Sequence, residues 1–489
     1  MGTMAASFFF YDLETSGFSP RAARIMQFAG QRTDMSLRPI GEPVNVLIKL
    51  TPDIVPDPDA VLVTGITPQQ TLADGLTEAE FLQLFYKEVV KPDTIFVGFN
   101  SIRFDDEFMR FLNYRNFYDA YEWQWKDRCS RWDLLDTARM TRALRPDDIK
   151  WPVTTDGKPT NRLELLTKLN KLSHDSAHDA LSDVWATIAV AELLHDKQPE
   201  LFNYLLETRK KDAVRAIVDS GKPFMYTSGR YSSEYLHTTA AVLLGRHAEQ
   251  DYALVYDLRQ DPMPFLEMSV DEIIEAWKFT KDPDAVRLPV KTLKYNRCPA
   301  VVPGVVKDEA TLDRLQLSRD DISRHLHLVS QNGPAFVDKL FDAVRQMDAA
   351  REKGQTAPSD GQLNVDEQLY DGFIGNADKP RLQAVRAARP EGLGGLATGF
   401  RDKRLRSLLP LYKARNYPQA LTGEEHTAWD EFCHQKLLDG GAGSRLATYF
   451  NRLEELAASQ LTAEKKYLVE ELRLYGEAIT PSADGDATG

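Results

Sequence analysis

The sequence predicts a multi-domain α/β protein, with a mixed sheet flanked by helices, then an α+β domain, then an all-α C-terminal domain. Length is the first observation behind this prediction, because 489 residues are too many for one compact core. The second is that apolar runs of strand character alternate with helical patterns in the earlier parts of the chain. The third is the helical spacing of apolar residues in the last part.

Residues 1–196 are expected to form the mixed sheet. The first three strands follow one another closely, which suits an antiparallel meander, whereas the later strands alternate with helices, which suits parallel crossovers. The expected strands are 7–14, 25–33, 44–50, 94–100 and 132–136, and the expected helices are 77–90 and 177–194.

Residues 197–350 are expected to form the α+β domain, because short β-rich runs are mixed there with helical patterns. Residues 351–362 are polar and rich in helix breakers, which indicates a linker. The β-rich runs are 252–258, 286–293 and 300–306.

The helical domain is predicted for residues 363–479. The small polar residues 480–489 are expected to be a disordered tail. The helical patterns are 405–412, 427–438 and 442–475.

Composition is that of an ordinary globular protein, since 43% of the residues are hydrophobic and 27% are charged. No run approaches the ~20 apolar residues that cross a bilayer, and the N-terminus lacks the layout of a signal peptide. We therefore expect a cytoplasmic protein that does not enter a membrane. Cys129, Cys298 and Cys433 are too few and too far apart for a disulfide framework or a zinc cluster.

The charge is unevenly distributed. The net charge is −13, from 60 basic and 73 acidic residues, yet residues 379–415 hold ten basic residues against Glu391 and Asp402. Such a run is either a solvated helix face or a positive track for a polyanion, and the sequence leaves both interpretations open.

The first candidate site lies at the end of the first predicted strand, where Asp12 and Glu14 are separated by Leu13. Side chains alternate along a strand, so the two carboxylates face one side and Leu13 the other. Two adjacent negative charges repel, and a hard cation such as Mg²⁺ would relieve that repulsion. The alternative is a strand that ends in a polar turn at residues 15–17.

Further ligand candidates follow two other predicted elements. Asp105 opens a helix after the strand at 94–100, whereas the neighbouring Asp106 and Glu107 are expected only to complement the helix dipole. His178 and Asp183 lie five residues apart in the helix at 177–194. A histidine near a helix start is commonly structural, but this one lies beside a possible fourth carboxylate.

These three segments resemble the three motifs of the DEDD exonuclease superfamily, in the subclass with a histidine five residues before the last aspartate. Within it the chain resembles the bacterial exonuclease I family over nearly its whole length, excluding about the last dozen residues. The segments that carry this wider likeness are 114–119, 130–136, 162–164, 296–299 and 368–373.

The resemblance implies an RNase H-like exonuclease domain, an SH3-like barrel and a helical domain that together clasp DNA. It also implies an exodeoxyribonuclease that degrades single-stranded DNA in the 3′-to-5′ direction, releasing 5′-mononucleotides in DNA repair and recombination. Carried over by motif, Asp12, Glu14, Asp105 and Asp183 would hold two Mg²⁺ ions, with Mn²⁺ as a substitute. His178 would be the general base. Two-metal hydrolysis and a base that titrates near neutral pH suit this chemistry.

Single-strand binding needs stacking platforms and a positive track, and residues 110–132 interleave aromatic and basic side chains. Tyr121 and Trp125 are spaced to share one helix face. Leu13 is expected beside the terminal base if the strand ends before it. With the help of the family likeness, the expected substrate contacts are Leu13, Glu14, Thr15, Thr64, Ile66, Arg110, Tyr121, Trp125, Arg139 and Arg162.

The resemblance also implies a protein partner, the acidic C-terminal tail of single-stranded DNA-binding protein (SSB), with Arg145 and Tyr204 in its pocket. We expect a monomer. Two alternatives remain. A DEDD exonuclease for RNA or proofreading is disfavoured by the about 290 residues beyond the first domain. A nucleic-acid-binding protein that has lost catalysis is disfavoured because all four carboxylates and the histidine are present.

Overall fold

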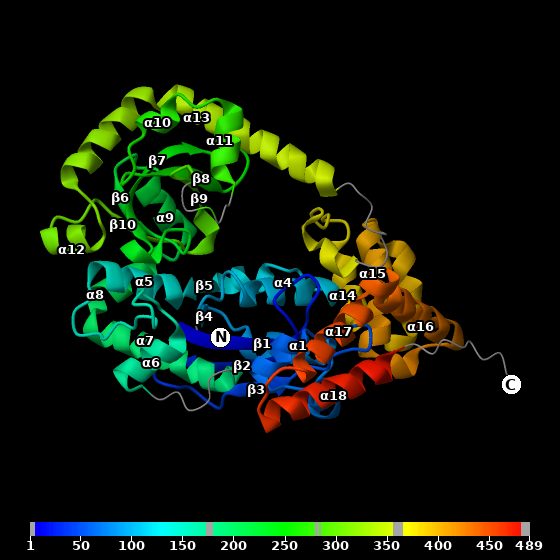
Figure 1. Ribbon diagram of the computed structural model, residues 1–489. Helices are drawn as coiled ribbons and strands as arrows, with labels where there is room; N and C mark the ends of the chain where they lie inside the picture. The colour runs from blue at the N-terminus through cyan, green and yellow to red at the C-terminus, as the bar shows by residue number, and fades with distance from the viewer. Residues whose placement is uncertain (1–4, 173–178, 279–281, 283–284, 356–364, 481–489) are drawn as a thin grey trace.

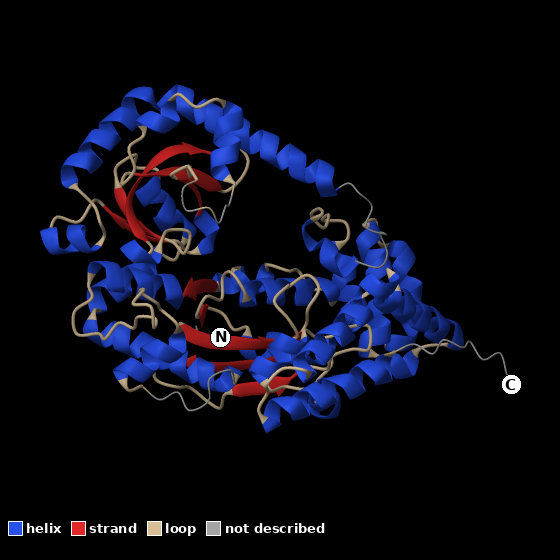
Figure 2. Ribbon diagram, in the orientation of Figure 1, coloured by secondary structure: helices blue, strands red, loops and turns tan. Residues whose placement is uncertain are grey.

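The computed structural model describes residues 5–172, 179–278, 282, 285–355 and 365–480. Figure 1 shows the first sheet and the helices around it in the lower half of the view, a second sheet above them, and a group of C-terminal helices to one side. Figure 2 shows the strands of the second sheet curving around one another, while the C-terminal group is entirely helical. The described helices include none with the length and apolar character that crossing a bilayer requires.

The first sheet has the strand order β3-β2-β1-β4-β5. β1 pairs antiparallel with β2 and parallel with β4, and β5 is parallel to β4, so the predicted meander and crossovers are confirmed. The third strand ends three residues earlier than expected. The strands are β1 (Ser7–Thr15), β2 (Ile25–Thr33), β3 (Val44–Leu47), β4 (Thr94–Gly98) and β5 (Ser130–Asp133).

The strand predicted at 132–136 was placed wrongly, because the chain enters a helix at Leu134. The side chain of Asp133 accepts a hydrogen bond from the backbone N–H of Leu135 at 2.9 Å, and so caps that helix. Aspartate is among the best N-cap residues, since its carboxylate satisfies an unpaired amide of the first turn.

Helices surround the first sheet. The predicted helix at 77–90 is α3 followed by a π-helical turn, η1 (Phe85–Val89), and the one at 177–194 corresponds to α7. The helices are α1 (Pro58–Thr64), α2 (Pro68–Asp74), α3 (Glu78–Leu84), α4 (Asp105–Arg115), α5 (Leu134–Leu144), α6 (Leu163–Asn170), α7 (Ala180–Lys197) and α8 (Pro199–Thr208).

The second sheet is antiparallel throughout, in the order β10-β6-β7-β8-β9. Its strands are β6 (Phe224–Thr227), β7 (Thr238–Arg246), β8 (Tyr252–Asp257), β9 (Val290–Lys294) and β10 (Ala300–Pro303). Its helices are α9 (Lys211–Val218), α10 (Met263–Leu266), α11 (Val270–Trp277), α12 (Glu309–Arg314) and α13 (Arg319–Gln355).

α13 begins beside the second sheet and runs toward the C-terminal helices (Figure 1). It continues through residues 351–355, where the sequence led us to expect a linker. Arginine, glutamate and lysine at 351–353 are good helix formers, so the helix outlasts the predicted boundary. Residues 356–364 lie outside the described part of the chain.

The C-terminal helices pack on the first domain through several apolar clusters. Phe111 and Phe117, in and just after α4, share a buried apolar cluster with Leu408 of α15. Val61 of α1 lies in another cluster with Leu472 of α18. The helices are α14 (Lys379–Ala387), α15 (Lys403–Asn416), α16 (Gly423–Leu438), α17 (Arg445–Ala457) and α18 (Ala463–Ile479).

A buried group of charges joins the same two domains. Asp53 accepts from Arg415 at 2.7 Å and from Lys436 at 2.6 Å. Asp366 accepts from Arg24 at 2.7 Å and from Arg415 at 2.9 Å. Burial raises the pKa of the two carboxyls, but Arg415 and the other cations outweigh it and hold both pKa values below the usual range. We call these five residues the interdomain charge cluster.

Candidate functional site

The end of β1 presents Asp12 and Glu14 on one face of the sheet. Glu14 is 9% exposed and Asp12 is half-buried. Leu13 turns to the opposite face and packs in a core cluster with Phe9 and Tyr11. The buried aromatic residues before Asp12 therefore fix the position of the strand, so that both carboxylates project from the same face of the sheet.

Asp183 joins these two carboxylates from the first turn of α7, which packs across β1 and β2. One oxygen from each of Asp12, Glu14 and Asp183 lies within 4.8 Å of the others. Asp179 caps the same helix, because its carboxylate accepts from the amide of Ser182 at 3.1 Å. The cap fixes where the helix begins, and hence where Asp183 points.

The cluster is electrostatically strained. Burial raises the pKa of Glu14 to about 9, and the charges of Asp12 and Asp183 add to the rise. Burial likewise raises the pKa of Asp12 well above its usual value, with Asp183 and Asp179 as further causes. Carboxylates that repel one another in a partly dry site are stabilised when a cation lies between them.

Asp105 approaches the cluster from the start of α4. Burial and the charge of Asp12 raise the pKa of Asp105. The loop before it is held by Asp133, whose carboxylate accepts from the amides of Asn100 at 2.9 Å and Ile102 at 3.3 Å. Glycine is needed at position 98, since an added Cβ would lie 2.5 Å from the Cβ of Ser101. Asp105 is thus buried near Asp12 but is not part of the 4.8 Å group.

This donor set fits hard divalent cations. It consists only of carboxylates, whose oxygens are the ligands that such ions prefer. The raised pKa values of Asp12 and Glu14 are the repulsion that a bound cation would relieve. The geometry alone therefore supports a metal centre at the end of β1.

We expect Glu14→Gln to stabilise the metal-free protein by up to about 5 kcal/mol at pH 8, since each pH unit above the ordinary pKa of 4.5 costs ~1.4 kcal/mol. The pKa of Glu14 is about 9 in the folded state and 4.5 as the ordinary value. Because the pKa of Glu14 is higher in the folded state than in the unfolded state, its carboxyl contributes full stability below pH ~4.5, and this contribution is lost as the pH rises toward 9. Glutamine does not ionise, so the variant does not lose stability in this way. Urea denaturation in EDTA from pH 5 to 9 measures it.

Glu249→Gln, at an exposed glutamate, is the matched control for this substitution. Its unfolding free energy should follow that of the wild type across the range. A Glu14→Gln protein that loses stability with pH as steeply as the wild type would contradict the proposed repulsion.

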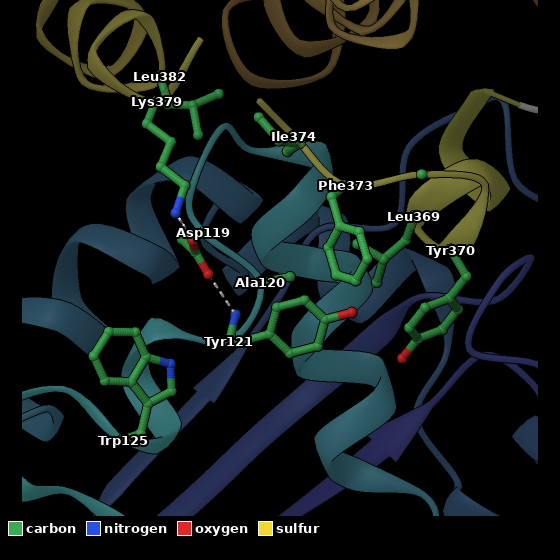
Figure 3. Close-up of a pocket in the computed structure, with 11 residues that line it drawn as sticks. Asp119, Ala120, Tyr121, Trp125, Leu369, Tyr370, Phe373, Ile374, Lys379 and Leu382 are labelled. Atoms are coloured by element: carbon green, nitrogen blue, oxygen red, sulfur yellow. Dashed lines mark hydrogen bonds and ion pairs between the residues drawn. The ribbon is translucent and has the colours of Figure 1, made fainter. Parts of the chain in front are cut away.

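Two predicted aromatic contacts line one pocket of about 350 Å³, together with Tyr370, Phe373 and Lys379 of the C-terminal part (Figure 3). Trp125 is 62% exposed and Phe373 is 96% exposed. Tyr121 and Trp125 do not share an α-helix as expected, since they flank a short 3₁₀ turn at Glu122–Gln124. Exposed rings around a pocket suit stacking on planar groups.

The predicted arginine contacts occupy different environments. Arg110 is buried, donates to Glu107 and Gln124, and lies 5.4 Å from the ring centre of Tyr121. Arg139 pairs with Asp136 at 2.7 Å. Arg162 is exposed at the start of α6. Arg110 also lines a second cleft of about 670 Å³ between the first two domains.

The remaining predicted residues are placed as follows. Thr15 is the last residue of β1, and its hydroxyl donates to the carbonyl of Gly17 at 2.9 Å. Thr64 and Ile66 are half-buried where α1 gives way to α2. β1 continues through Thr15, so the condition for contact of Leu13 with a terminal base is not met, and we drop that contact. His178 lies outside the described residues.

The two predicted partner residues lie on α8 and at the end of α5. Arg145 is exposed and Tyr204 is half-buried. The basic run at 379–415 is not simply a solvated face, because Lys413 pairs with Glu425 and Arg415 belongs to the interdomain charge cluster.

Sequence reasoning missed Asp179. Its charge raises the pKa of Asp12 and Glu14, so it contributes to the field of the cluster. The signal was present, since an aspartate directly before an apolar helical pattern is a common N-cap.

Three family models match this chain. A model described as Exonuclease matches residues 9–191, the Exonuclease I SH3-like domain matches 209–344, and the Exonuclease I C-terminal domain matches 363–479. Their order is the predicted order of the three folds.

Curated relatives cover most of the chain. Exodeoxyribonuclease I of Escherichia coli is 39% identical over 89% of this chain and 90% of its own length. Exodeoxyribonuclease I of Haemophilus influenzae is 39% identical over 88% of this chain and 90% of its own length.

Solved structures agree over nearly the whole chain. E. coli exonuclease I with a dA16 oligonucleotide has a TM-score of 0.89 at 37% identity, covering 97% of this chain and 100% of that one. A structure of SSB/exonuclease I with an inhibitor has a TM-score of 0.87 at 36% identity, covering 98% and 100%. The zinc-bound form of an E. coli exonuclease I–single-stranded DNA complex has a TM-score of 0.89 at 36% identity, covering 97% and 99%.

Proposed function

This chain belongs to the exonuclease I family, and we infer that it is an exodeoxyribonuclease that degrades single-stranded DNA from the 3′ end. The predicted family and fold class are thereby confirmed. The observation that carries the activity to this chain is the partly buried cluster of Asp12, Glu14 and Asp183. An RNase H-like sheet without it would bind nucleic acid but lack ligands for a metal.

The family and the carboxylate cluster support a divalent metal cofactor. We propose Mg²⁺, two ions per site, with Mn²⁺ as a substitute, held by the three clustered carboxylates and Asp105. When bound, such ions activate water and stabilise the departing 3′ oxygen. His178 is proposed to take the proton from that water, since imidazole titrates near neutral pH.

We propose that the DNA strand reaches this centre across the half-buried ring of Tyr121 and the exposed ring of Trp125. Arg162 is exposed and free to approach a phosphate, and Thr15, Thr64, Ile66 and Arg139 stay proposed contacts. The proposed role of Arg110 is indirect, because its guanidinium is already bonded within the protein and supports the ring of Tyr121. We also propose that the protein is a cytoplasmic monomer that acts in DNA repair and recombination. The proposed domain limits are 1–196, 197–350 and 363–479.

Directional digestion tests the function. With Mg²⁺, we expect 3′-labelled single-stranded DNA to release its label at once as a 5′-mononucleotide, whereas a 5′ label is released only when the strand has been consumed. RNA of the same sequence should be degraded much more slowly. EDTA should stop the reaction. Immediate release of the 5′ label, or digestion that EDTA leaves unchanged, would contradict the proposal.

The SSB tail is the proposed protein partner, supported by the solved SSB/exonuclease I structure. We place it at Arg145 and Tyr204, a cation and a half-buried ring that suit an acidic, apolar peptide end. Arg145→Ala and Tyr204→Ala should each weaken binding of an SSB-tail peptide about ten-fold in fluorescence anisotropy. Arg38→Ala, at an arginine whose side chain is 78% exposed, should not. Unchanged binding in both variants would exclude this pocket.

A further inference from the structure

One carboxylate is bonded to all three domains. Glu107 lies in the first turn of α4, two residues after Asp105, and its side chain is 13% exposed. Its Oε1 accepts from Arg110 of its own helix at 2.6 Å and forms an ion pair with Arg297 of the second domain, with an N···O distance of 2.8 Å. Its Oε2 accepts from the hydroxyl of Tyr370 in the C-terminal domain.

The second domain also contacts the first turn of α4 and the residues just before it. Arg297 donates to the carbonyl of Ile102 at 2.8 Å, just before α4 begins. Arg131 of β5 pairs with Asp106 and donates to the carbonyl of Asn296 at 2.9 Å. The loop at 296–297 is therefore bonded to the turn that carries Asp105 through more than one contact.

Asp106 also connects the first turn of α4 to the strand that carries the carboxylate cluster. Its carboxylate accepts from the hydroxyl of Tyr11 at 2.5 Å, and Tyr11 directly precedes Asp12 on β1. The first turn of α4 is thus fastened on one side to the strand of the metal cluster and on the other to two further domains. These bonds exceed the sequence expectation that Asp106 and Glu107 only complement the helix dipole.

We propose that Glu107 is a positioning residue that couples the placement of the second and C-terminal domains to metal binding at the cluster. If either domain moved away, a largely buried carboxylate would lose a partner, and the arrangement that keeps Asp105 beside Asp12 would be disfavoured. Coupling of this kind is reciprocal. A bound DNA strand that holds the three domains together would therefore also favour the carboxylate arrangement that binds the metal. The inference rests on the proposed function, because that function requires the metal, but the coupling itself can be measured in the chain without DNA.

Calorimetric titration of the full DNA-free chain with Mn²⁺ tests this coupling. Glu107→Gln should weaken metal binding about ten-fold or more, the range seen when partners of metal ligands are removed. Arg297→Gln and Tyr370→Phe each break one arm and should each weaken binding several-fold. Tyr370 acts through Glu107, so Tyr370→Phe should have no further effect in the Glu107→Gln background, whereas Arg297→Gln should keep only the part of its effect that comes from its bond to the carbonyl of Ile102.

Tyr86→Phe is the matched control, since the Tyr86 hydroxyl donates to Asn113 of the same helix at 2.7 Å without leaving the domain. It should leave metal affinity unchanged even if it lowers the melting temperature. Metal affinity of Glu107→Gln within two-fold of the wild type, or full effects of Arg297→Gln and Tyr370→Phe in its background, would overturn the proposal. Failure of the wild type to release nucleotides would instead count against the function.

Discussion

Asp183→Ala is expected to abolish nucleotide release, with a fall of at least ~10³-fold in the single-turnover rate, while single-stranded DNA still binds within a few-fold of the wild type. The residue supplies one of three carboxylates that have an oxygen within 4.8 Å of the others, so its loss removes a ligand from the proposed metal site. Metal stabilisation of developing charge is worth several kcal/mol, and each 1.36 kcal/mol is ten-fold in rate. Binding depends instead on rings and cations outside the cluster.

Rapid-quench digestion of 3′-labelled DNA and anisotropy in EDTA separate these two effects. Asp196→Ala removes an exposed carboxylate from the same helix, and serves as the matched control with an unchanged rate. Asp12→Ala should behave like Asp183→Ala. Normal cleavage by either variant would mean that the metal centre has been assigned wrongly.

The second large effect is expected at the interdomain charge cluster. Asp53→Ala should lower the free energy of unfolding by about 3–5 kcal/mol, because it leaves Lys436 and Arg415 buried without a full set of partners. The pKa of Asp53 lies below its usual range, so its contribution is present above the unfolded pKa and is lost as the pH falls. Urea denaturation at pH 7 measures the size, and denaturation at pH 2, below the ordinary pKa of 3.8, measures the sign, because the difference between wild type and variant should shrink there.

Asp59→Ala is the control for Asp53→Ala. Asp59 also joins the first domain to the C-terminal helices, through Arg452 at 2.8 Å, but both side chains are more than 40% exposed. Its removal should cost much less, since water screens exposed pairs. Equal losses from the two substitutions would show that burial does not set the strength of this connection.

The parts of the fold that sequence predicted best are those with strong local patterns. The aromatic run before Asp12 and the apolar run at 25–33 could only be buried strands, and the alternation that predicted a shared face for Asp12 and Glu14 is confirmed. The strand at 132–136 was predicted wrongly, because the capping role of Asp133 is visible only in its hydrogen bond to the backbone of Leu135.

Long-range partners explain the rest of the difference. Arg415 was counted in a positive run, yet its charge is matched by Asp53 and Asp366, which no local window contains. Glu107 was read as a dipole partner, because Arg297 and Tyr370 come from domains that sequence does not place beside it. A count of charges shows how many are present but not which of them are already paired.

The interdomain charge cluster also bears on the time course of synthesis. Asp53 and Lys436 are 383 residues apart. At about 5–20 residues per second, a ribosome needs roughly 20–80 s to cover that interval. Asp53 is made at the start of this interval, Arg415 follows 362 residues after it and Lys436 comes last, so the interdomain charge cluster is incomplete until the interval ends. The buried contacts that Asp53 and Arg24 make in the folded protein therefore form late, when α15 and α16 have been synthesised.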